Sequence, residues 1–317
     1  MLSGGKIKVF FEKAGLWRPK HIHKVVNINS LYKIFKESLS INFVSKKTVA
    51  NLTRYIFLLF PNCKIYLLTG LVVLLSAFQP LNESKMYVKT VVIDAGHGGT
   101  DPGCTYGGVY EKDINLKIAL ELGRMIQEKM KDVKVIYTRS TDVFVELHKR
   151  PEIAHRNNAN VFISIHCNAN ENHAAKGTET YVMGVNKSAA NLKVAMAENA
   201  VIKLEDNYLE KYDGFDPNSP EAYIIFSLYQ DAFQDQSLLL ASKIEEHFKK
   251  TASRLSKGVK QAGFLVLWKN SMPSVLIETG FLSNQEEREY LSSKEGQLQT
   301  ATAIFNAFEE YRLEVEE

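Results

Sequence analysis

Two histidines and two glutamates stand at positions that suit metal-dependent hydrolysis. His97 lies in a glycine-rich loop after a run of β-branched residues, and His166 and Glu278 each end a similar apolar run. Glu111 lies between the two histidines in the sequence. Open α/β sheets bind ligands at the carboxyl ends of their strands. Zinc accepts imidazole nitrogen and carboxylate oxygen, and a catalytic zinc site uses three protein ligands. These residues therefore favour a zinc hydrolase.

The spacing of His97, Glu111 and His166 does not by itself establish a metal site. It matches no local zinc motif of the His-Glu-x-x-His kind. A histidine at the end of a strand is more often a hydrogen-bonding residue. Glu111 precedes a predicted helix, where a carboxylate also interacts favourably with the helix dipole. The residues alone leave both interpretations open.

Glu278 is the residue most difficult to explain without a functional site. It follows a buried-strand pattern, and an ionised carboxylate costs several kcal/mol to bury without a partner. Beside a metal ion it would take a proton from bound water and pass it to a leaving amine. The alternative is a structural salt bridge.

The pattern along the chain predicts an α/β sandwich with a mainly parallel or mixed sheet, because strands and helices alternate. The predicted strands cover 88–94, 133–137, 161–166, 178–182, 263–268 and 274–278. The predicted helices cover 113–130, 150–158, 187–204, 221–254 and 285–314, and Asp113 is the predicted N-cap of the first.

Charge is divided unevenly between the two ends of the chain. Residues 1–64 hold twelve Lys and Arg against two Asp and Glu, whereas residues 86–317 hold 26 against 33. A basic half favours nucleic-acid binding as a first interpretation. The segment that follows it argues for export instead, so we expect no nucleic-acid partner.

Residues 65–78 form an apolar run of 14 residues without charge. This is short for a membrane span, which needs roughly 20 residues, but it fits the core of a signal peptide. We predict a signal peptide or membrane anchor with its linker over 65–85, and an exported protein of the periplasm or cell envelope. Residues 1–64 are then a basic, disordered extension, either a misplaced start or a cytoplasmic tail. A buried core helix is the alternative for 65–78.

Three cysteines are too few for a disulfide framework. Cys104 follows the His97 loop and Cys167 follows His166, so the two are expected to be neighbours. We predict small buried apolar residues at both positions, with a disulfide or a metal-ligand role as the alternative. Cys63 would be lost with a signal peptide.

Four blocks in one order resemble the zinc-dependent N-acetylmuramoyl-L-alanine amidases of the amidase 3 family. They are 92–103 around His97, 110–116 around Glu111, 162–169 around His166, and 277–284 around Glu278. Tyr137-Thr138-Arg139, Asp142, Leu147 and Arg150 resemble the family's connecting pattern. Cys167 is a small departure, since alanine is commoner there.

The resemblance implies a fold, a site and a reaction. It implies a single catalytic domain over 86–317, with a central sheet of about six strands flanked by helices. His97, Glu111 and His166 would bind one Zn²⁺ ion, and Glu278 would be the catalytic carboxylate. The reaction would be hydrolysis of the amide between N-acetylmuramic acid and L-alanine in peptidoglycan, for wall remodelling and daughter-cell separation.

The stretch from Tyr181 to Gly263, about 80 residues, is longer than a compact link needs. It resembles the cell-separation amidases, in which an inserted helical segment covers the zinc until a partner displaces it. We expect a helical insert around 184–260 and a lid within 200–235. Glu205, Asp206 or Glu210 would then occupy the open zinc position. The alternative is a surface helical hairpin without a regulatory role.

Two other functions are alternatives to the amidase. A zinc carboxypeptidase on a related fold would need an arginine for the substrate carboxylate, and no motif identifies one. A non-catalytic wall-binding protein is disfavoured by the intact set of His97, Glu111, His166 and Glu278. The expected partners are peptidoglycan and an activator protein, with membrane contact only through the N-terminal apolar segment.

Overall fold

The computed structural model describes residues 87–185, 188–226 and 232–317. These residues belong to one structural unit, Lys85–Glu317. The predicted basic extension 1–64, the predicted signal or anchor segment 65–85 and Cys63 lie outside the described residues. Within the described part of the chain, no helix combines the length and the apolar character that a membrane crossing needs.

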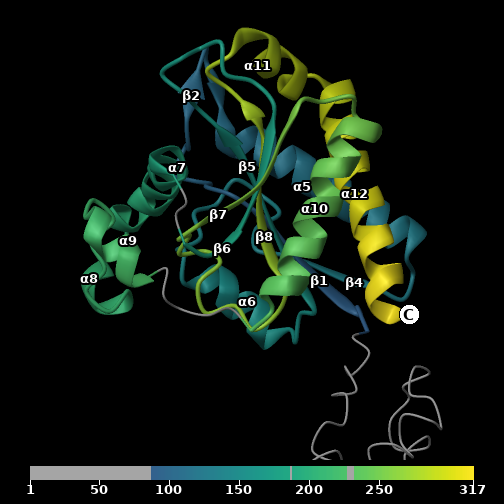
Figure 1. Ribbon diagram of the computed structural model, residues 1–317, viewed down its shortest axis with the longest axis horizontal. Helices are drawn as coiled ribbons and strands as arrows, with labels where there is room; N and C mark the ends of the chain where they lie inside the picture. Colours follow the sequence, from purple (N-terminus) through teal and green to yellow (C-terminus); the bar gives the residue numbers. More distant parts are fainter. Residues whose placement is uncertain (1–86, 186–187, 227–231) are drawn as a thin grey trace, which may run out of the picture. The chain divides into compact units, whose positions relative to one another are not determined.

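Six strands form one mixed sheet in the order β4–β1–β5–β8–β6–β7 (Figure 1). In chain order they are β1 (Thr90–Ala95), β4 (Lys134–Tyr137), β5 (Val161–Asn168), β6 (Thr178–Met183), β7 (Ser256–Ala262) and β8 (Ser274–Phe281). All neighbours are parallel except β6 and β8, which are antiparallel. A small hairpin of β2 (Thr105–Tyr106) and β3 (Val109–Tyr110) follows β1. The predicted α/β class with a mostly parallel six-stranded sheet is confirmed.

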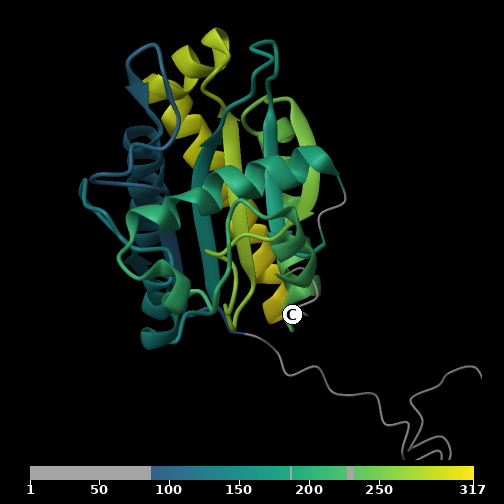
Figure 2. The ribbon, with the colours of Figure 1, turned by 90° about the vertical axis from the view of Figure 1, so that its left-hand side faces the viewer.

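Helices cover both faces of the sheet. The longest three, α5 (Glu111–Lys129), α10 (Gln234–Lys250) and α12 (Lys294–Glu316), pack on one face. The other face carries α6 (Lys149–Arg156), α7 (Ala189–Asn199), η1 (Ala200–Leu204), α8 (Tyr208–Lys211) and α9 (Pro220–Phe226). Figure 2 looks onto this second face and shows α7 lying across the strands. The short α11 (Gln285–Ser292) follows β8.

Alternation along the central strands decides which side chains face α7. In β5, Ile163 and Ile165 pack in the core beneath α5 and α12, whereas Phe162 packs on the opposite face. Successive strand residues point to opposite faces, so Ser164 and His166 share the face of Phe162. A functional histidine at the end of β5 is thus directed toward α7 rather than into the long-helix layer.

Three predicted helix boundaries were wrong. The first predicted helix begins at Glu111 with Tyr110 as N-cap, so Asp113 lies in its first turn instead of capping it. The predicted helix 221–254 is two helices, α9 and α10, and residues 227–231 between them are not described. The predicted helix 285–314 breaks at Ser293, whose side chain accepts from Gly296 N and caps α12.

The predicted strand 263–268 was also wrong. Phe264–Trp268 is buried but forms turns, in which Leu267 N donates to Phe264 O at 3.1 Å. The strand at this edge of the sheet is β7, which precedes it and carries two lysines. Edge strands tolerate charged residues because one side of the strand has no neighbour. The apolar content of 263–268 therefore led to the wrong prediction, since the edge strand is the more polar β7.

A buried ion pair supports the loop that follows β1. Arg150 Nη1 lies 2.7 Å from Asp94 Oδ1, and Arg150 Nη2 donates to the His97 carbonyl at 3.1 Å. Burial alone would raise the pKa of Asp94, but Arg150 together with the Thr138 and Ser164 hydroxyls holds it below its usual value. The arginine therefore joins α6, β1 and the His97 loop into one unit.

We predict that Arg150→Met lowers the free energy of unfolding by about 3–5 kcal/mol, because it leaves the buried Asp94 carboxylate without its partner. Urea unfolding followed by circular dichroism measures this. The control is Arg156→Met, which removes an exposed pair with Glu152 at 3.2 Å and should cost less than about 1 kcal/mol. Equal losses for the two variants would contradict the structural role of Arg150.

Candidate metal centre

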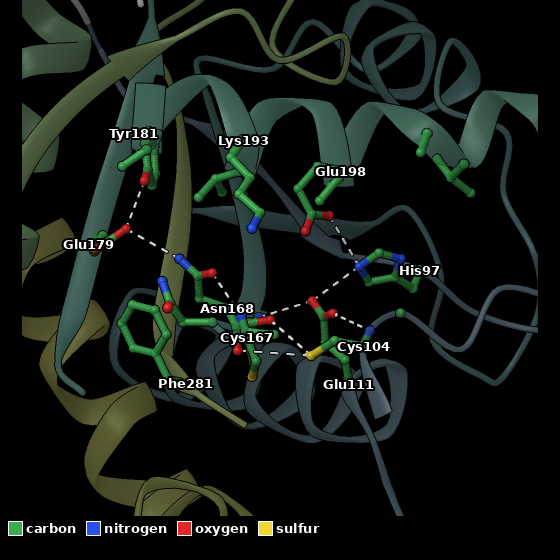
Figure 3. Close-up of a pocket in the computed structure, with 18 of the residues that line it drawn as sticks. His97, Cys104, Glu111, Cys167, Asn168, Glu179, Tyr181, Lys193, Glu198 and Phe281 are labelled. Atoms are coloured by element: carbon green, nitrogen blue, oxygen red, sulfur yellow. Dashed lines mark hydrogen bonds and ion pairs between the residues drawn. The ribbon is translucent and has the colours of Figure 1, made fainter. Parts of the chain in front are cut away.

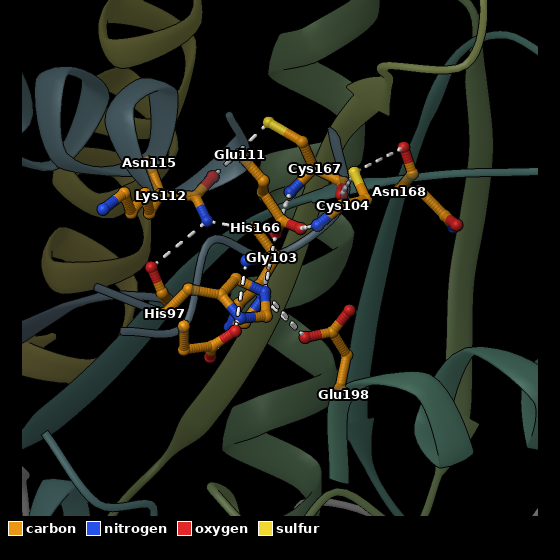
Figure 4. Close-up of polar contacts among 12 residues, drawn as sticks. His97, Gly103, Cys104, Glu111, Lys112, Asn115, His166, Cys167, Asn168 and Glu198 are labelled. Atoms are coloured by element: carbon orange, nitrogen blue, oxygen red, sulfur yellow. Dashed lines mark hydrogen bonds and ion pairs between the residues drawn. The ribbon is translucent and has the colours of Figure 1, made fainter. Parts of the chain in front are cut away.

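Four side chains from separate parts of the chain converge at the carboxyl ends of β1 and β5 (Figure 4). One nitrogen or oxygen from each of His97, Glu111, His166 and Glu198 lies within 4.8 Å of the others. The structure thus brings together the three residues expected to bind metal. It adds Glu198, which comes from α7.

His97 is oriented by its neighbour Asp101. Its Nδ1 lies 2.7 Å from Asp101 Oδ2, which leaves Nε2 directed at Glu111 Oε1 at 3.1 Å and Glu198 Oε2 at 3.2 Å. The backbone of His97 has φ 62°, a conformation uncommon for a residue with a side chain. Such backbone strain is typical of functional sites, where surrounding contacts hold it in place.

Two glycines make room for the converging side chains. A Cβ on Gly96 would overlap the imidazole of His166. A Cβ on Gly103 would press on both Glu111 and His97, and Gly103 also has a positive φ of 66°. The glycine-rich sequence after β1 is therefore needed for close approach as well as for turning.

Glu111 is held by backbone and side-chain donors at the start of α5. Its Oε2 accepts from Cys104 N at 2.9 Å, and its Oε1 accepts from Cys167 N at 3.0 Å and Asn115 Nδ2 at 3.1 Å. Burial by itself would raise the pKa of Glu111. The adjacent histidines outweigh this and hold the pKa well below its usual value. Glu111 is thus a fixed, ionised carboxylate.

The electrostatics of the cluster favour a cation. His166 Nδ1 lies 2.9 Å from Glu198 Oε2 and 3.2 Å from Glu111 Oε1. Burial opposes protonation of both imidazoles, yet the two carboxylates raise the pKa of His166 to about 10 and that of His97 well above its usual value. Carboxylates that favour protonation of the imidazoles would also favour a metal cation at the same position.

The unpaired atoms indicate which kind of cation fits. Within the described ranges, no hydrogen bond reaches the buried atoms His97 Nε2, His166 Nδ1 and Glu198 Oε2. Each faces the others across a short gap instead. Two imidazole nitrogens with carboxylate oxygens form a donor set that suits zinc.

Glu278 lies beside the cluster on β8. Its Cα is opposite that of His166 on one side and that of Glu179 on the other, so the three side chains share the sheet face beneath α7. Glu278 is 0% exposed, and neither carboxylate oxygen has a hydrogen-bond partner among the described residues. Burial, followed by the charge of Glu198, raises the pKa of Glu278 well above its usual value. This is the environment of an acid–base group.

A cavity of about 660 Å³ opens beside the cluster. Figure 3 shows His97 and Glu111 on one side of it and Glu179, Tyr181 and Phe281 on the other. Helix α7 lies above and carries Glu198, whose side chain is 13% exposed. The candidate site is therefore a covered pocket.

The three acidic residues expected to fill the open metal position do not reach it. Glu205 is buried elsewhere, where it accepts from Leu147 N at 2.8 Å and from the Tyr212 hydroxyl at 2.9 Å. Asp206 and Glu210 are exposed. The residue from the insert that enters the site is Glu198, which lies before the expected lid of 200–235.

Cys104 and Cys167 lie next to the cluster without joining it. Both thiols are free, and burial raises their pKa values. Cys167 Sγ contacts Asn115 Oδ1 at 3.4 Å, and Cys104 Sγ contacts the Cys167 carbonyl at 3.5 Å. They are partly or fully buried neutral thiols, consistent with the predicted packing role.

Glu198 and Asp101 were not predicted as site residues from the sequence. Glu198 has no local signal, because it stands in an ordinary helical pattern and reaches the site only when α7 folds over the sheet. Asp101 is four residues after His97, and this spacing within a turn-rich loop was the available signal. Asx side chains in such loops commonly accept local hydrogen bonds.

Comparison with known proteins identifies the family. The family model of the N-acetylmuramoyl-L-alanine amidases (Amidase_3) matches residues 91–310. The chain belongs to this family. The amidase AmiA of Escherichia coli K12 is 34% identical over 220 residues, covering 68% of this chain and 73% of that protein. The predicted enzyme class, a peptidoglycan amidase, is confirmed.

Solved structures agree with the family and the fold. An amidase from Clostridium difficile 630 has a TM-score of 0.53 at 28% identity and covers 72% of this chain and 97% of its own. The catalytic domain of CwlV from Bacillus (Paenibacillus) polymyxa has a TM-score of 0.51 at 30% identity, covering 72% and 99%.

We predict that the purified amidase holds one divalent metal ion per chain, and that His97→Ala/His166→Ala abolishes this binding because half of the donor set is removed. Elemental analysis by mass spectrometry gives the stoichiometry. His247→Ala removes another buried histidine, which contacts Thr251 and Glu310 outside the cavity, and should retain the metal. Full metal content in the double variant would contradict this site.

Proposed function

We propose that this chain is a zinc-dependent amidase in which His97, Glu111 and His166 hold one Zn²⁺ ion. The observation that carries the proposal is the convergence of two buried imidazole nitrogens with oxygens of Glu111 and Glu198 at 2.9–3.2 Å. When bound, zinc would polarise the scissile carbonyl and lower the pKa of its water toward about 7. The substrate is the amide between N-acetylmuramic acid and L-alanine.

Glu278 is proposed to move the proton that the reaction requires. Hydrolysis of an amide needs a base for the attacking water and an acid for the leaving nitrogen. A buried carboxylate next to the metal centre, with no competing hydrogen bond and a raised pKa, suits both steps. The cavity offers no arginine among its described lining residues, which disfavours a carboxypeptidase.

We predict that Glu278→Gln lowers kcat by roughly 10²–10⁴-fold, because proton transfer is lost while shape is kept. The products of peptidoglycan digestion, identified by mass spectrometry, measure this. Released stem peptides with an N-terminal L-alanine are expected from the wild type. Glu245→Gln is the matched control, since Glu245 is a buried glutamate that binds Thr178 and Thr180 outside the cavity. Cleavage within the glycan or the stem would contradict the assignment.

Export and a role in cell separation belong to the same proposal. Peptidoglycan lies outside the cytoplasmic membrane, so an enzyme that hydrolyses it must leave the cytoplasm. The apolar segment within 65–85 is the proposed export signal or anchor. Wall remodelling between daughter cells is the proposed context.

Helix α7 is proposed to be the autoinhibitory element, with Glu198 in the open metal position. Glu198 Oε2 is as close to the two histidines as Glu111 is, so it would compete with water and substrate. The related CwlD amidase of Clostridioides difficile was solved in complex with the GerS lipoprotein. An amidase similar to this chain thus binds a protein partner, and we propose that a partner of this chain acts by displacing α7.

Hydrogen bonds fix the inserted helices to the rest of the domain. Asn199, at the end of α7, donates to the Gly263 carbonyl at 2.8 Å and accepts from Leu265 N at 2.9 Å. Glu205 accepts from Leu147 N and the Tyr212 hydroxyl, so it ties η1 to the loop before α6. An activator would have to break these contacts to expose the metal.

We predict that Glu198→Ala raises the basal kcat/KM roughly tenfold or more, the equivalent of about 1.4 kcal/mol of lost closed-state stabilisation. Initial rates on isolated cell walls measure this. Glu210→Ala is the control, because Glu210 is an exposed acid of the same insert. Loss of activity together with loss of metal would show that Glu198 is a permanent ligand instead.

A further inference from the structure

Two lysines on β7 line the side of the cavity opposite the metal cluster. Lys257 and Lys260 both contact Glu179 Oε1, at 3.2 Å and 2.6 Å. Their ammonium groups also lie over aromatic rings, Lys257 over Phe281 at 4.6 Å and Lys260 over Tyr181 at 5.7 Å. Figure 3 shows these two rings with Glu179 across the cavity from His97. The two cations are thus held in place before any ligand arrives.

This side of the cavity has an unbalanced positive charge. Glu179 offers one negative charge to two lysines, and its other oxygen is occupied by Asn168 Nδ2 at 3.2 Å and the Tyr181 hydroxyl at 2.7 Å. The third lysine of the cavity, Lys193, is neutralised by Glu171 at 2.6 Å. Among the described residues, one of the two ammonium groups has no carboxylate of its own. The side chains of Lys257 and Lys260 are 36% and 21% exposed. An anionic ligand would complete the set.

The sheet register sets the distance between the two sides. Glu179 is opposite Glu278, and Glu278 is opposite His166, so two strand spacings, about 10 Å, separate the backbones of His166 and Glu179. An extended peptide advances about 3.3 Å per residue. The long side chains of Lys257 and Lys260 shorten the remaining distance between β7 and the metal side of the cavity. With the scissile amide at the metal site, a carboxylate on the residue after L-alanine would therefore come within reach of the β7 lysines.

We propose that Lys257 and Lys260 bind the first free carboxylate of the stem peptide, on the residue that follows L-alanine. The proposal rests on the proposed amidase function and adds the substrate group that the cavity selects. It also orients the substrate. The lactyl carboxyl of muramic acid is consumed in the scissile amide, so only the peptide side offers a carboxylate. The peptide extends toward β7, and the glycan leaves by the other side.

The test compares two muramoyl dipeptides that differ at one group, a free carboxylate or a carboxamide on the second residue. The readout is the ratio of the two kcat/KM values. The fraction of molecules in which α7 covers the site is the same for both substrates, so it cancels in this ratio. A charge-assisted hydrogen bond should give the wild type a roughly tenfold higher kcat/KM for the carboxylate substrate, through a lower KM. Lys257→Met/Lys260→Met should bring the ratio close to one. Lys269→Met removes an exposed lysine paired with Asp213 and should leave the ratio unchanged.

A charge variant separates binding from positioning. Glu179→Gln keeps the size of the side chain and removes the negative charge that pairs with both lysines, so it should increase the preference for the carboxylate. A decrease would mean that the cluster only supports the fold of this edge, and would overturn the proposal. Equal cleavage of both substrates by the wild type would also overturn it while leaving the amidase function intact. If neither the wild type nor Glu198→Ala cleaves either compound at the muramoyl amide, the proposed function itself fails.

Discussion

The confinement of two carboxylates and two imidazoles in one buried pocket is the constraint on which the rest of this structure depends. Glu111 and Glu198 raise the pKa values of His97 and His166 against the effect of burial. Two carboxylates that face two buried imidazoles favour positive charge between them. Many features of the surrounding fold serve this arrangement, including the glycines at 96 and 103, the Asp101 contact and the strained backbone of His97.

The mixed sheet links the metal centre to the rest of the active site. Parallel pairing of β5 with β8 sets His166 beside Glu278, and the antiparallel β6 then sets Glu179 beside Glu278. One row across three strands thus places a proposed metal ligand, a proposed proton carrier and the residue that holds two lysines. A change of one residue in register would turn any of them to the opposite face of the sheet. The row explains how a single fold supplies chemistry and substrate orientation together.

Much of this architecture could be predicted from the sequence, because strong local patterns of apolar residues encode the central strands. The apolar runs that end in His166 and Glu278 gave strands with the expected positions, because buried strands have a clear pattern. Strand β7 was missed because its polar sequence, typical of an edge, resembles a loop. Glu198 was missed for a different reason. Its role depends on how α7 packs across the sheet, and no spacing within the helix encodes that contact.

The proposed chemistry depends on the binding of zinc by two histidines and carboxylate oxygens. X-ray absorption at the zinc edge of the purified full chain measures this binding, because it reports the ligand atoms themselves. We expect four nitrogen or oxygen ligands at about 2.0–2.2 Å, with multiple scattering from two imidazoles. Sulfur ligands at about 2.3 Å, from Cys104 or Cys167, or fewer than two imidazoles would contradict it.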